Sequence, residues 1–129
     1  MTFSFPDHFR FADSHEYACQ DNDTVKVGIS AFAVDQLGDI VFVDLPDKGS
    51  SLIKGTTFGS VESVKAVEDM YAPISGEVIQ RNESVLENPE DLQSDPHGKG
   101  WLLLIKPSDI TEIEDLMTST AYSAKVITN

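Results

Sequence analysis

The 129-residue chain is poor in cysteine, in histidine and in positive charge. Its one cysteine, Cys19, excludes an internal disulfide and a cysteine-based metal cluster. His8, His15 and His97 are scattered without the HxH or HxxxH spacing of a metal site, so we expect no metal. Nine Lys and Arg residues stand against 22 Asp and Glu residues, a formal net charge of -13. Such a surface would repel phosphates, so the sequence predicts no binding of nucleic acid.

The chain also lacks a long apolar run. No stretch approaches the roughly 20 residues that span a membrane, and residues 1–10 carry charges and Pro6 where a signal peptide would be apolar. The negative charge disfavours an anionic membrane surface. We expect a soluble protein, cytoplasmic in a bacterium and in the mitochondrial matrix of a eukaryote. The acidic surface would serve solubility or steer the protein toward basic faces of larger enzymes.

Short strand-like segments separated by Gly and Pro turns fill most of the sequence. Segments 57–64 and 67–72 predict a hairpin with a bulge, or with a tip that leaves the main sheet. Apolar patterns predict four further strands, at 25–29, 40–45, 77–81 and 101–107. Segment 40–45 is expected to be buried on both faces. The predicted fold class is mainly β, an antiparallel β-sandwich or flattened barrel.

Short helices are expected between and after these strands. Ser30 is predicted to cap a helix that Gly38 ends, and Asn88 to cap a helical turn with Pro89 at its first position. Segment 119–126 predicts a last helix. Ser108 is predicted to cap a helix through residue 117, with an apolar stripe of Ile110, Ile113, Leu116 and Met117.

The N-terminal region contributes four aromatic residues. We expect them to form an edge strand or an arm packed on the sandwich: Phe3, Phe5, Phe9 and Phe11. No low-complexity linker divides the chain. We therefore expect one domain over residues 1–129, with a core over about 24–107 and a C-terminal helical segment over about 108–127.

Lys65 lies between the two strands of the predicted hairpin, beside the small residues Ser63 and Ala66. A tight turn there would push the lysine outward and leave its amine free. An exposed lysine is a point charge on a flexible stem, which alone catalyses little but is accessible to a modifying enzyme. Gly49, sixteen residues earlier, and Gly76, eleven residues later, would let the backbone turn where a side chain would clash.

This Gly-Lys-Gly layout resembles that of lipoyl and biotinyl domains, in which two pseudo-symmetric halves meet at a lysine hairpin. Val64 and Ala66 replace the methionines usual around biotin, and Val-Lys-Ala differs from the Asp-Lys-Ala of lipoyl domains in 2-oxo-acid dehydrogenases. Residues 13–120 resemble the glycine cleavage H-protein family. The matching segments, in the family's order and spacing, are 14–17, 27–30, 37–46, 61–66, 73–78, 95–102 and 106–107.

The resemblance implies a lipoyl-domain fold of the barrel-sandwich hybrid type with short helices and a C-terminal helix. It implies a non-catalytic carrier with lipoate in amide linkage to Lys65. Glycine decarboxylase, which uses pyridoxal phosphate, would load an aminomethyl group on the arm, and the tetrahydrofolate-dependent aminomethyltransferase would unload it. Dihydrolipoamide dehydrogenase would reoxidise the arm, and a lipoate ligase or lipoyltransferase would attach it.

The resemblance also implies that Ser14, Glu16 and Asp69 line a cleft for the loaded arm. A carboxylate suits that place because the aminomethyl group carries a protonated amine. The alternative is that Glu16 and Asp69 are solvated acids. The sequence departs from the family at Tyr17, where Trp is usual, and at His97, where Tyr is usual.

Two other functions remain open at this point. A lipoate relay, or a lipoyl module of 2-oxo-acid dehydrogenases, would use the same Lys65. A small hydrolase built on Ser14, His15 and Glu16 is a remote alternative, because adjacent residues of an extended segment point to opposite faces. We expect His15 to be a surface or partly buried structural histidine.

Overall fold

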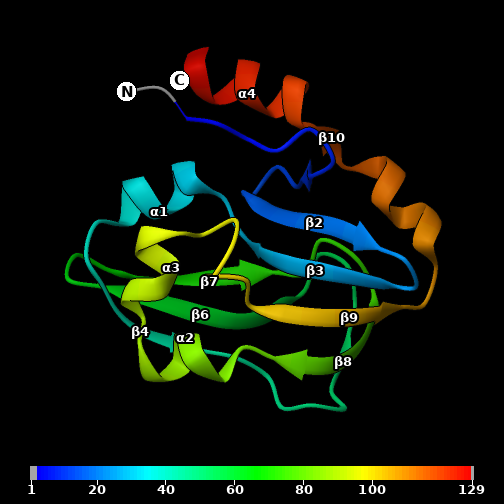
Figure 1. Ribbon diagram of the computed structural model, residues 1–129, viewed down its shortest axis with the longest axis horizontal. Helices are drawn as coiled ribbons and strands as arrows, with labels where there is room; N and C mark the ends of the chain where they lie inside the picture. The colour runs from blue at the N-terminus through cyan, green and yellow to red at the C-terminus, as the bar shows by residue number, and fades with distance from the viewer. Residues whose placement is uncertain (1–2, 129) are drawn as a thin grey trace.

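The computed structural model describes residues 3–128, which form two antiparallel sheets (Figure 1). The larger sheet has the strand order β10-β1-β2-β3-β9-β8-β5, and the smaller has the order β4-β6-β7. The strands of the larger sheet are β10 (Met117–Thr118), β1 (Arg10–Phe11), β2 (Glu16–Asp21), β3 (Thr24–Ile29), β9 (Leu103–Pro107), β8 (Gly76–Arg81) and β5 (Ser51–Leu52). The smaller sheet contains β4 (Ile40–Asp44), β6 (Thr57–Ser63) and β7 (Val67–Tyr71). The predicted mainly β class is confirmed, and the sheets do not close into a barrel.

The main apolar core lies between the two sheets. Alternate residues of β3 and β9, such as Val27 and Ile105, meet Val61 and Met70 of the smaller sheet's inner face in one buried cluster. Burying such side chains contributes about 1.5–3 kcal/mol each. The period-2 pattern of the sequence therefore decides which face of each strand turns inward.

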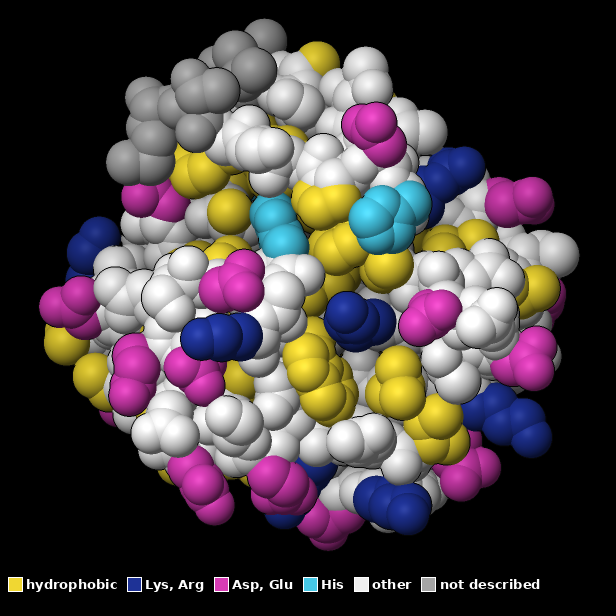
Figure 2. All heavy atoms as spheres, viewed as in Figure 1, with side chains coloured by type: hydrophobic (Ala, Val, Ile, Leu, Met, Phe, Trp, Pro, Cys, Tyr) yellow, Lys and Arg dark blue, Asp and Glu magenta, His cyan; other side chains and the backbone are white. Residues whose placement is uncertain are grey.

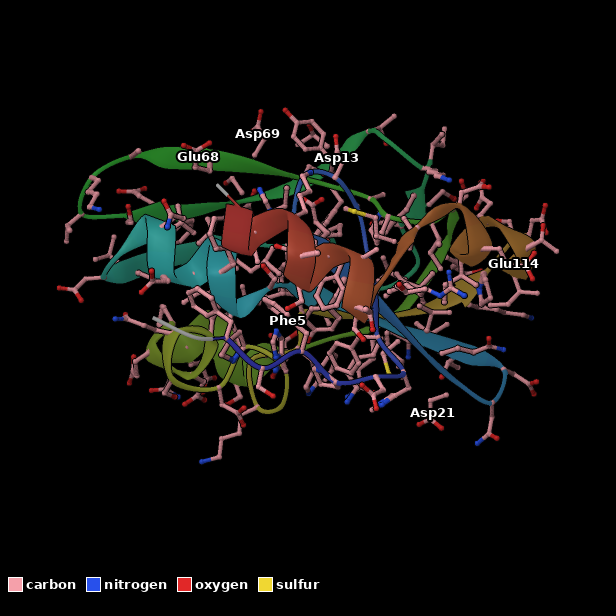
Figure 3. The ribbon with its side chains drawn as sticks, turned by 90° about the horizontal axis from the view of Figure 1, so that it is seen from above. Phe5, Asp13, Asp21, Glu68, Asp69 and Glu114 are labelled. Carbon is pink, nitrogen blue, oxygen red and sulfur yellow. The ribbon has the colours of Figure 1, made fainter. Side chains whose placement is uncertain are left out.

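A second apolar cluster covers the outer side of the larger sheet. The N-terminal arm brings Phe9 and Phe11 against Tyr17 of β2, and helix α4 (Ser119–Thr128) closes over them. Phe11 stacks on Tyr122 with ring centroids 4.3 Å apart, and Phe5 lies against the same helix (Figure 3). The expected aromatic arm and the last helix are both confirmed.

The surface carries far more negative than positive charge. Four ion pairs among the described residues engage only three cations, Lys54, Arg81 and Lys125. Most of the 22 acidic side chains therefore have no ion-pair partner within residues 3–128. Acidic side chains are spread over the face shown in Figure 2 rather than gathered in one patch.

Strand β4 corrects the expectation of burial on both faces. Val41 is 50% exposed and Phe42 is 54% exposed. The reason is that β4 is an edge strand of the smaller sheet and only the inner face of that sheet meets the core. A bulge between Ile40 and Phe42 interrupts the alternation, so two consecutive side chains face outward while Ile40 and Val43 stay buried.

Helix α1 (Ala31–Leu37) forms as predicted. The Ser30 hydroxyl accepts a hydrogen bond from Ala33 N at 3.1 Å, and Gly38 ends the helix with a φ of +80°. Because α1 packs beside the Lys65 hairpin, its position helps to shape the site described below.

The predicted cap at Asn88 is wrong. Asn88 ends a helix that the sequence reading missed, α2 (Glu83–Glu87), which is capped by Asn82 Oδ1 accepting from Ser84 N at 3.1 Å. The next helix, α3 (Glu90–Ser94), begins after Pro89 without a side-chain cap. Each helix has only five residues, too few to show a helical period in the sequence.

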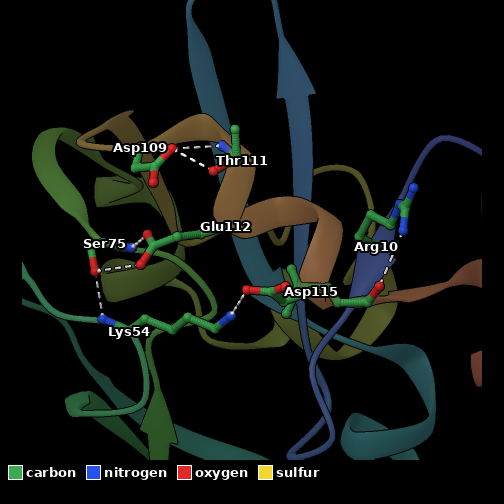
Figure 4. Close-up of polar contacts among 8 residues, drawn as sticks. Arg10, Lys54, Ser75, Asp109, Thr111, Glu112 and Asp115 are labelled. Carbon is green, nitrogen blue, oxygen red and sulfur yellow. Dashed lines mark hydrogen bonds and ion pairs between the residues drawn. The ribbon is translucent and has the colours of Figure 1, made fainter.

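The expected helix from Ser108 through Met117 is also wrong. The segment is a 3₁₀-helix, η1 (Ile110–Asp115), capped by Asp109, and Met117 belongs to β10. Polar contacts hold it in place, since Glu112 accepts hydrogen bonds from Ser75 N at 2.8 Å and from Ser75 Oγ at 3.3 Å (Figure 4). These contacts compete with the continuous helix that the apolar spacing predicted.

Gly49 and Gly76 lie outside the Lys65 hairpin, where β5 meets β8. Gly49 has a φ of +94° and donates from its N to Val78 O at 2.7 Å, with open space where a Cβ would lie. Gly76 faces a different constraint, because its Cβ would lie 2.4 Å from Lys106 O. Gly49 is thus required by its dihedral angle and Gly76 by a close backbone approach.

Substitutions at the two glycines should therefore differ. Gly76→Ala should lower the free energy of unfolding by about 1–3 kcal/mol through overpacking, and Gly49→Ala by roughly 1–2 kcal/mol through strain at positive φ. Asparagine tolerates positive φ, so Gly49→Asn should recover most of the loss while Gly76→Asn should not. Urea unfolding measures all four. Equal stability of the two Asn variants would contradict this assignment.

Candidate functional site

A buried hydroxyl shapes the tip of the β6–β7 hairpin. Ser63 is 5% exposed, and its Oγ accepts hydrogen bonds from Lys65 N at 3.1 Å and from Ala66 N at 3.2 Å. Val64 N donates to Asp39 O at 3.0 Å, which ties the tip to the segment before β4. The backbone of the tip is therefore fixed, while the Lys65 side chain projects outward.

The Lys65 amine is free to react. It lies in no ion pair with the described residues, and its hydrogen bond to Gln36 O is long at 3.5 Å. Its neighbours Val64 and Val67 are 68% and 62% exposed, so apolar side chains flank it. A modifying enzyme would find an accessible amine on a rigid tip.

A cleft of about 360 Å³ opens beside this lysine, between α1 and the β6–β7 hairpin. It is lined by Ser14, His15, Glu16, Ile29, Phe32, Ala33, Gln36, Leu37, Val61, Glu68, Asp69 and Met70. The lining brings together the three residues that the family resemblance placed in one cleft. Gln36 belongs to the lining and contacts Lys65 Nζ, so Lys65 stands at the mouth.

Glu16 forms the buried acidic end of the cleft. Its side chain is 2% exposed. One carboxylate oxygen accepts from Ser14 Oγ, and the other accepts from Tyr71 N at 3.0 Å. Burial raises the pKa of Glu16, while the hydrogen bonds from Ser14 and Tyr71 act in the opposite direction. The interpretation of Glu16 as a solvated acid is therefore wrong.

Asp69 is exposed, as a solvated acid would be, yet it lies on the rim of the same cleft next to Glu68. Figure 3 shows both side chains on β7, along the side of the molecule where Asp13 also lies. With Glu16 they give three carboxyl groups in a lining that contains no Lys or Arg. The cleft is thus suited to a cation. Glu68 was missed in the sequence, where it reads as one more acid of an acidic chain.

The side chains of Ser14, His15 and Glu16 do not have the geometry of a hydrolase active site. Ser14 Oγ donates to Glu16 and not to His15, whose Nδ1 lies 2.7 Å from the Tyr122 hydroxyl. His15 is half-buried, as expected for a structural histidine. Its partner Tyr122 is 107 positions away along the chain, so no local pattern could have indicated this contact.

The two departures from the family pattern contact each other. Tyr17 and His97 pack edge to face with ring centroids 5.7 Å apart. The Tyr17 hydroxyl donates to Pro96 O at 2.9 Å, and His97 Nε2 accepts from Ala31 N at 3.1 Å. Together they join the 95–100 loop to the start of α1, which forms one wall of the cleft.

Other kinds of site are not seen within residues 3–128. No group of three or more His, Cys, Asp or Glu side chains is arranged there to hold a metal ion. Cys19 is a free, buried thiol. No helix in this part of the chain has the length and apolar character to cross a membrane.

The stability gained by removing the charge of Glu16 should grow as the pH rises. Because folding raises the pKa of Glu16 above its ordinary value, the folded state holds the proton more tightly, and the free energy of unfolding falls as the pH rises from the ordinary pKa to the raised one. Glu16→Gln removes the buried charge, and its amide oxygen can accept from Tyr71 N while its NH₂ group donates to the Ser14 hydroxyl. Its stability advantage over wild type, measured by urea unfolding, should therefore grow from acidic to mildly alkaline pH.

The matched control is Glu77→Gln on the exposed side of β8. It removes the same charge without a buried carboxyl, so its difference from wild type should change much less with pH. A Glu16→Gln advantage that shrinks with rising pH would contradict the raised pKa.

Comparisons with known proteins agree with this geometry. The family model for glycine cleavage H-protein matches residues 9–129. Glycine cleavage system H proteins of Synechococcus sp. (strain CC9605) and Prochlorococcus marinus (strain NATL2A) are 75% and 67% identical over 126 residues, which is 98% of each chain. The crystal structure of a glycine cleavage system H protein from Mycobacterium marinum aligns with a TM-score of 0.87 at 33% identity, covering 94% of this chain and 98% of that one. The expected lipoyl-domain fold is thereby confirmed, and the chain belongs to the glycine cleavage H-protein family, the lipoyl carriers of the glycine cleavage system.

Proposed function

We propose that this chain carries its lipoyl group in amide linkage on Lys65 and has no turnover of its own. The observation that carries the proposal is the position of Lys65, on a fixed hairpin tip at the mouth of a cleft with three carboxyl groups and no cation. The lipoyl disulfide, when attached, supplies the acceptor for an aminomethyl cargo and the redox chemistry. The protein supplies position and protection.

The cleft residues act on the charge of the cargo. Glu16 is held by Ser14 and by Tyr71 N, so its carboxylate needs little reorganisation to face a protonated amine. Asp69 on the rim adds negative charge along the entry path. A charge-assisted contact of this kind contributes roughly 1.5–3 kcal/mol. The loaded arm should therefore rest in the cleft, shielded from water.

The partners follow from this carrier role. Glycine decarboxylase would load the arm, the aminomethyltransferase would unload it to tetrahydrofolate, and dihydrolipoamide dehydrogenase would reoxidise it. A lipoate ligase or lipoyltransferase would attach it. Residues 1–129 act as a single carrier domain. The protein is soluble, and in a bacterium it lies in the cytoplasm. The tether raises the effective concentration of the cargo at each docked active site.

Lipoylation should depend on Lys65 alone. Lys65→Arg keeps the charge but cannot be acylated, so intact-mass spectrometry after incubation with lipoate ligase, lipoate and ATP should show no lipoyl adduct. Lys48→Arg, in the exposed turn before β5, is the matched control and should gain the adduct like wild type. A lipoyl mass on the Lys65→Arg variant would refute the assignment.

Removal of the buried carboxylate should expose the cargo. In loaded protein without the transferase, Glu16→Ala should accelerate non-enzymatic ammonia release on the order of ten- to a hundredfold, the equivalent of roughly 1.5–3 kcal/mol. Glu77→Ala removes an exposed carboxyl away from the cleft and should leave the rate unchanged. Ammonia assays on the three proteins decide the matter. Equal rates in wild type and Glu16→Ala would assign Glu16 a purely structural role.

A further inference from the structure

Behind the cleft, three side chains from distant parts of the chain form a continuous hydrogen-bonded line. Ser30 is the N-cap of α1, Tyr122 comes from α4, and His15 lines the cleft itself. The Tyr122 hydroxyl lies 2.7 Å from Ser30 Oγ and 2.7 Å from His15 Nδ1. Ser30 and Tyr122 are both fully buried. The line therefore connects the C-terminal helix to the wall of the cleft.

The buried hydroxyl groups determine which atom donates and which accepts in each of these hydrogen bonds. Ser30 Oγ already accepts from Ala33 N at 3.1 Å, and within residues 3–128 its own proton has no acceptor except the Tyr122 oxygen. A buried hydroxyl proton without an acceptor is energetically costly. Ser30 therefore donates to Tyr122, and Tyr122 donates to His15 Nδ1. The single imidazole proton must then lie on Nε2, which has no hydrogen-bond partner among the described residues.

We infer that Ser30 and Tyr122 make His15 a positioning residue of the cleft, held as a neutral imidazole with its proton on Nε2, so that a cationic cargo meets carboxyl groups without an opposing charge. This inference rests on the proposed residence of the loaded arm in the cleft. Protonation of His15 would put a proton on Nδ1 and reverse the line, and the buried Ser30 hydroxyl would lose its acceptor. The geometry thus disfavours the charged form.

Burial and the surrounding charges act on the pKa of His15 in opposing directions. Burial lowers its pKa most, and Lys125 of α4 lowers it further, while Asp13 raises it. Of the other groups that face His15, none is a cation and three are carboxyl groups, whose negative charge favours the charged imidazole, so the neutral form is favoured by burial, by Lys125 and by the hydrogen bonds of Ser30 and Tyr122. These other groups are Phe32 of α1, Tyr122 of α4, Ser14 and Glu16 on its own segment, and Glu68 and Asp69 across the cleft.

The backbone supports a specific orientation of this residue. His15 has a φ of +84°, in the left-handed region that non-glycine residues seldom adopt. Its N donates to Ala12 O at 3.0 Å, and its O accepts from Ser30 N at 2.9 Å, so both sides of the residue are held. Such strain persists only where surrounding contacts enforce it, and here it directs the ring toward Tyr122.

The first experiment determines the protonation state directly. Long-range ¹H–¹⁵N NMR of the imidazole, recorded on unmodified protein, should show the proton of His15 on Nε2. Tyr122→Phe removes the donor to Nδ1 and should raise the pKa of His15. Tyr71→Phe, which removes an exposed hydroxyl, should leave that pKa unchanged. A proton on Nδ1, or an unchanged pKa in Tyr122→Phe, would overturn the inference.

The second experiment connects His15 to the cargo. A docked cation and a proton on His15 compete, so loading the arm should lower the pKa of His15 in wild type, by the reciprocity of linked binding. An unchanged pKa on loading would overturn the role of His15 toward the cargo. Lipoylation at Lys65 is read separately by intact mass, so this failure is distinguishable from failure of the attachment site.

A variant in place of His15 gives a third readout. Asparagine tolerates positive φ and stays neutral at all pH values, so His15→Asn keeps the uncharged wall. The ratio of ammonia release rates, loaded wild type over loaded His15→Asn, should be constant above the pKa of wild-type His15 and should rise as pH falls through it. The response of Glu16 is common to both proteins and cancels in the ratio. A ratio that stays constant with pH would overturn the inference.

Discussion

The buried carboxylate of Glu16 joins the two sheets at the floor of the cleft. It extends from β2 in the larger sheet and accepts a hydrogen bond from Tyr71 N in β7 of the smaller one. A buried charge costs several kcal/mol unless hydrogen bonds compensate it, and here the Tyr71 amide and the Ser14 hydroxyl do so. Glu16 therefore bridges the two sheets where it also lines the cleft.

Burial of the Glu16 carboxylate costs stability, although its negative charge is what would attract a cation. A neutral isostere would remove the cost of burying a charge, but it would also remove the charge that attracts a cation. Sites that bind or react are commonly less stable than the fold permits, because their charges are placed for a ligand rather than for the folded chain alone. The network of His15, Tyr122 and Ser30 adds rigidity without charge beside Glu16. The cleft therefore combines one costly buried acid with two carboxyl groups on its rim and a hydrogen-bonded network behind it.

Local patterns predicted the parts of the fold that depend on local interactions. The caps of α1, the hairpin with Lys65 at its tip and the aromatic arm follow from nearby residues. Predictions failed where a distant contact decides the outcome. Phe42 is exposed because its strand is at a sheet edge, and segment 110–115 is a 3₁₀-helix beside the Ser75 turn that Glu112 contacts.

The candidate site shows the same division. Lys65 is visible in the sequence because its setting is a hairpin, whereas Ser14, Glu16 and Asp69 were grouped only through the family resemblance. Nothing in the local spacing relates β2 to β7, since the pairing depends on how the sheets face each other. Tyr122 belongs to the terminal helix predicted over 119–126, and nothing in that segment indicates its contacts with Ser30 and His15. Such residues become visible when the tertiary fold places them together.

The contact between Lys65 Nζ and Gln36 O has a consequence for charge at the cleft mouth. Before modification, the ammonium group offsets part of the negative charge of Glu16, Glu68 and Asp69. Acylation of Lys65, as proposed, would remove that positive charge and leave the cleft with an uncompensated negative field. A cationic cargo on the arm would then supply positive charge inside the cleft. The unmodified lysine thus offsets part of the same negative charge that a cargo would offset later.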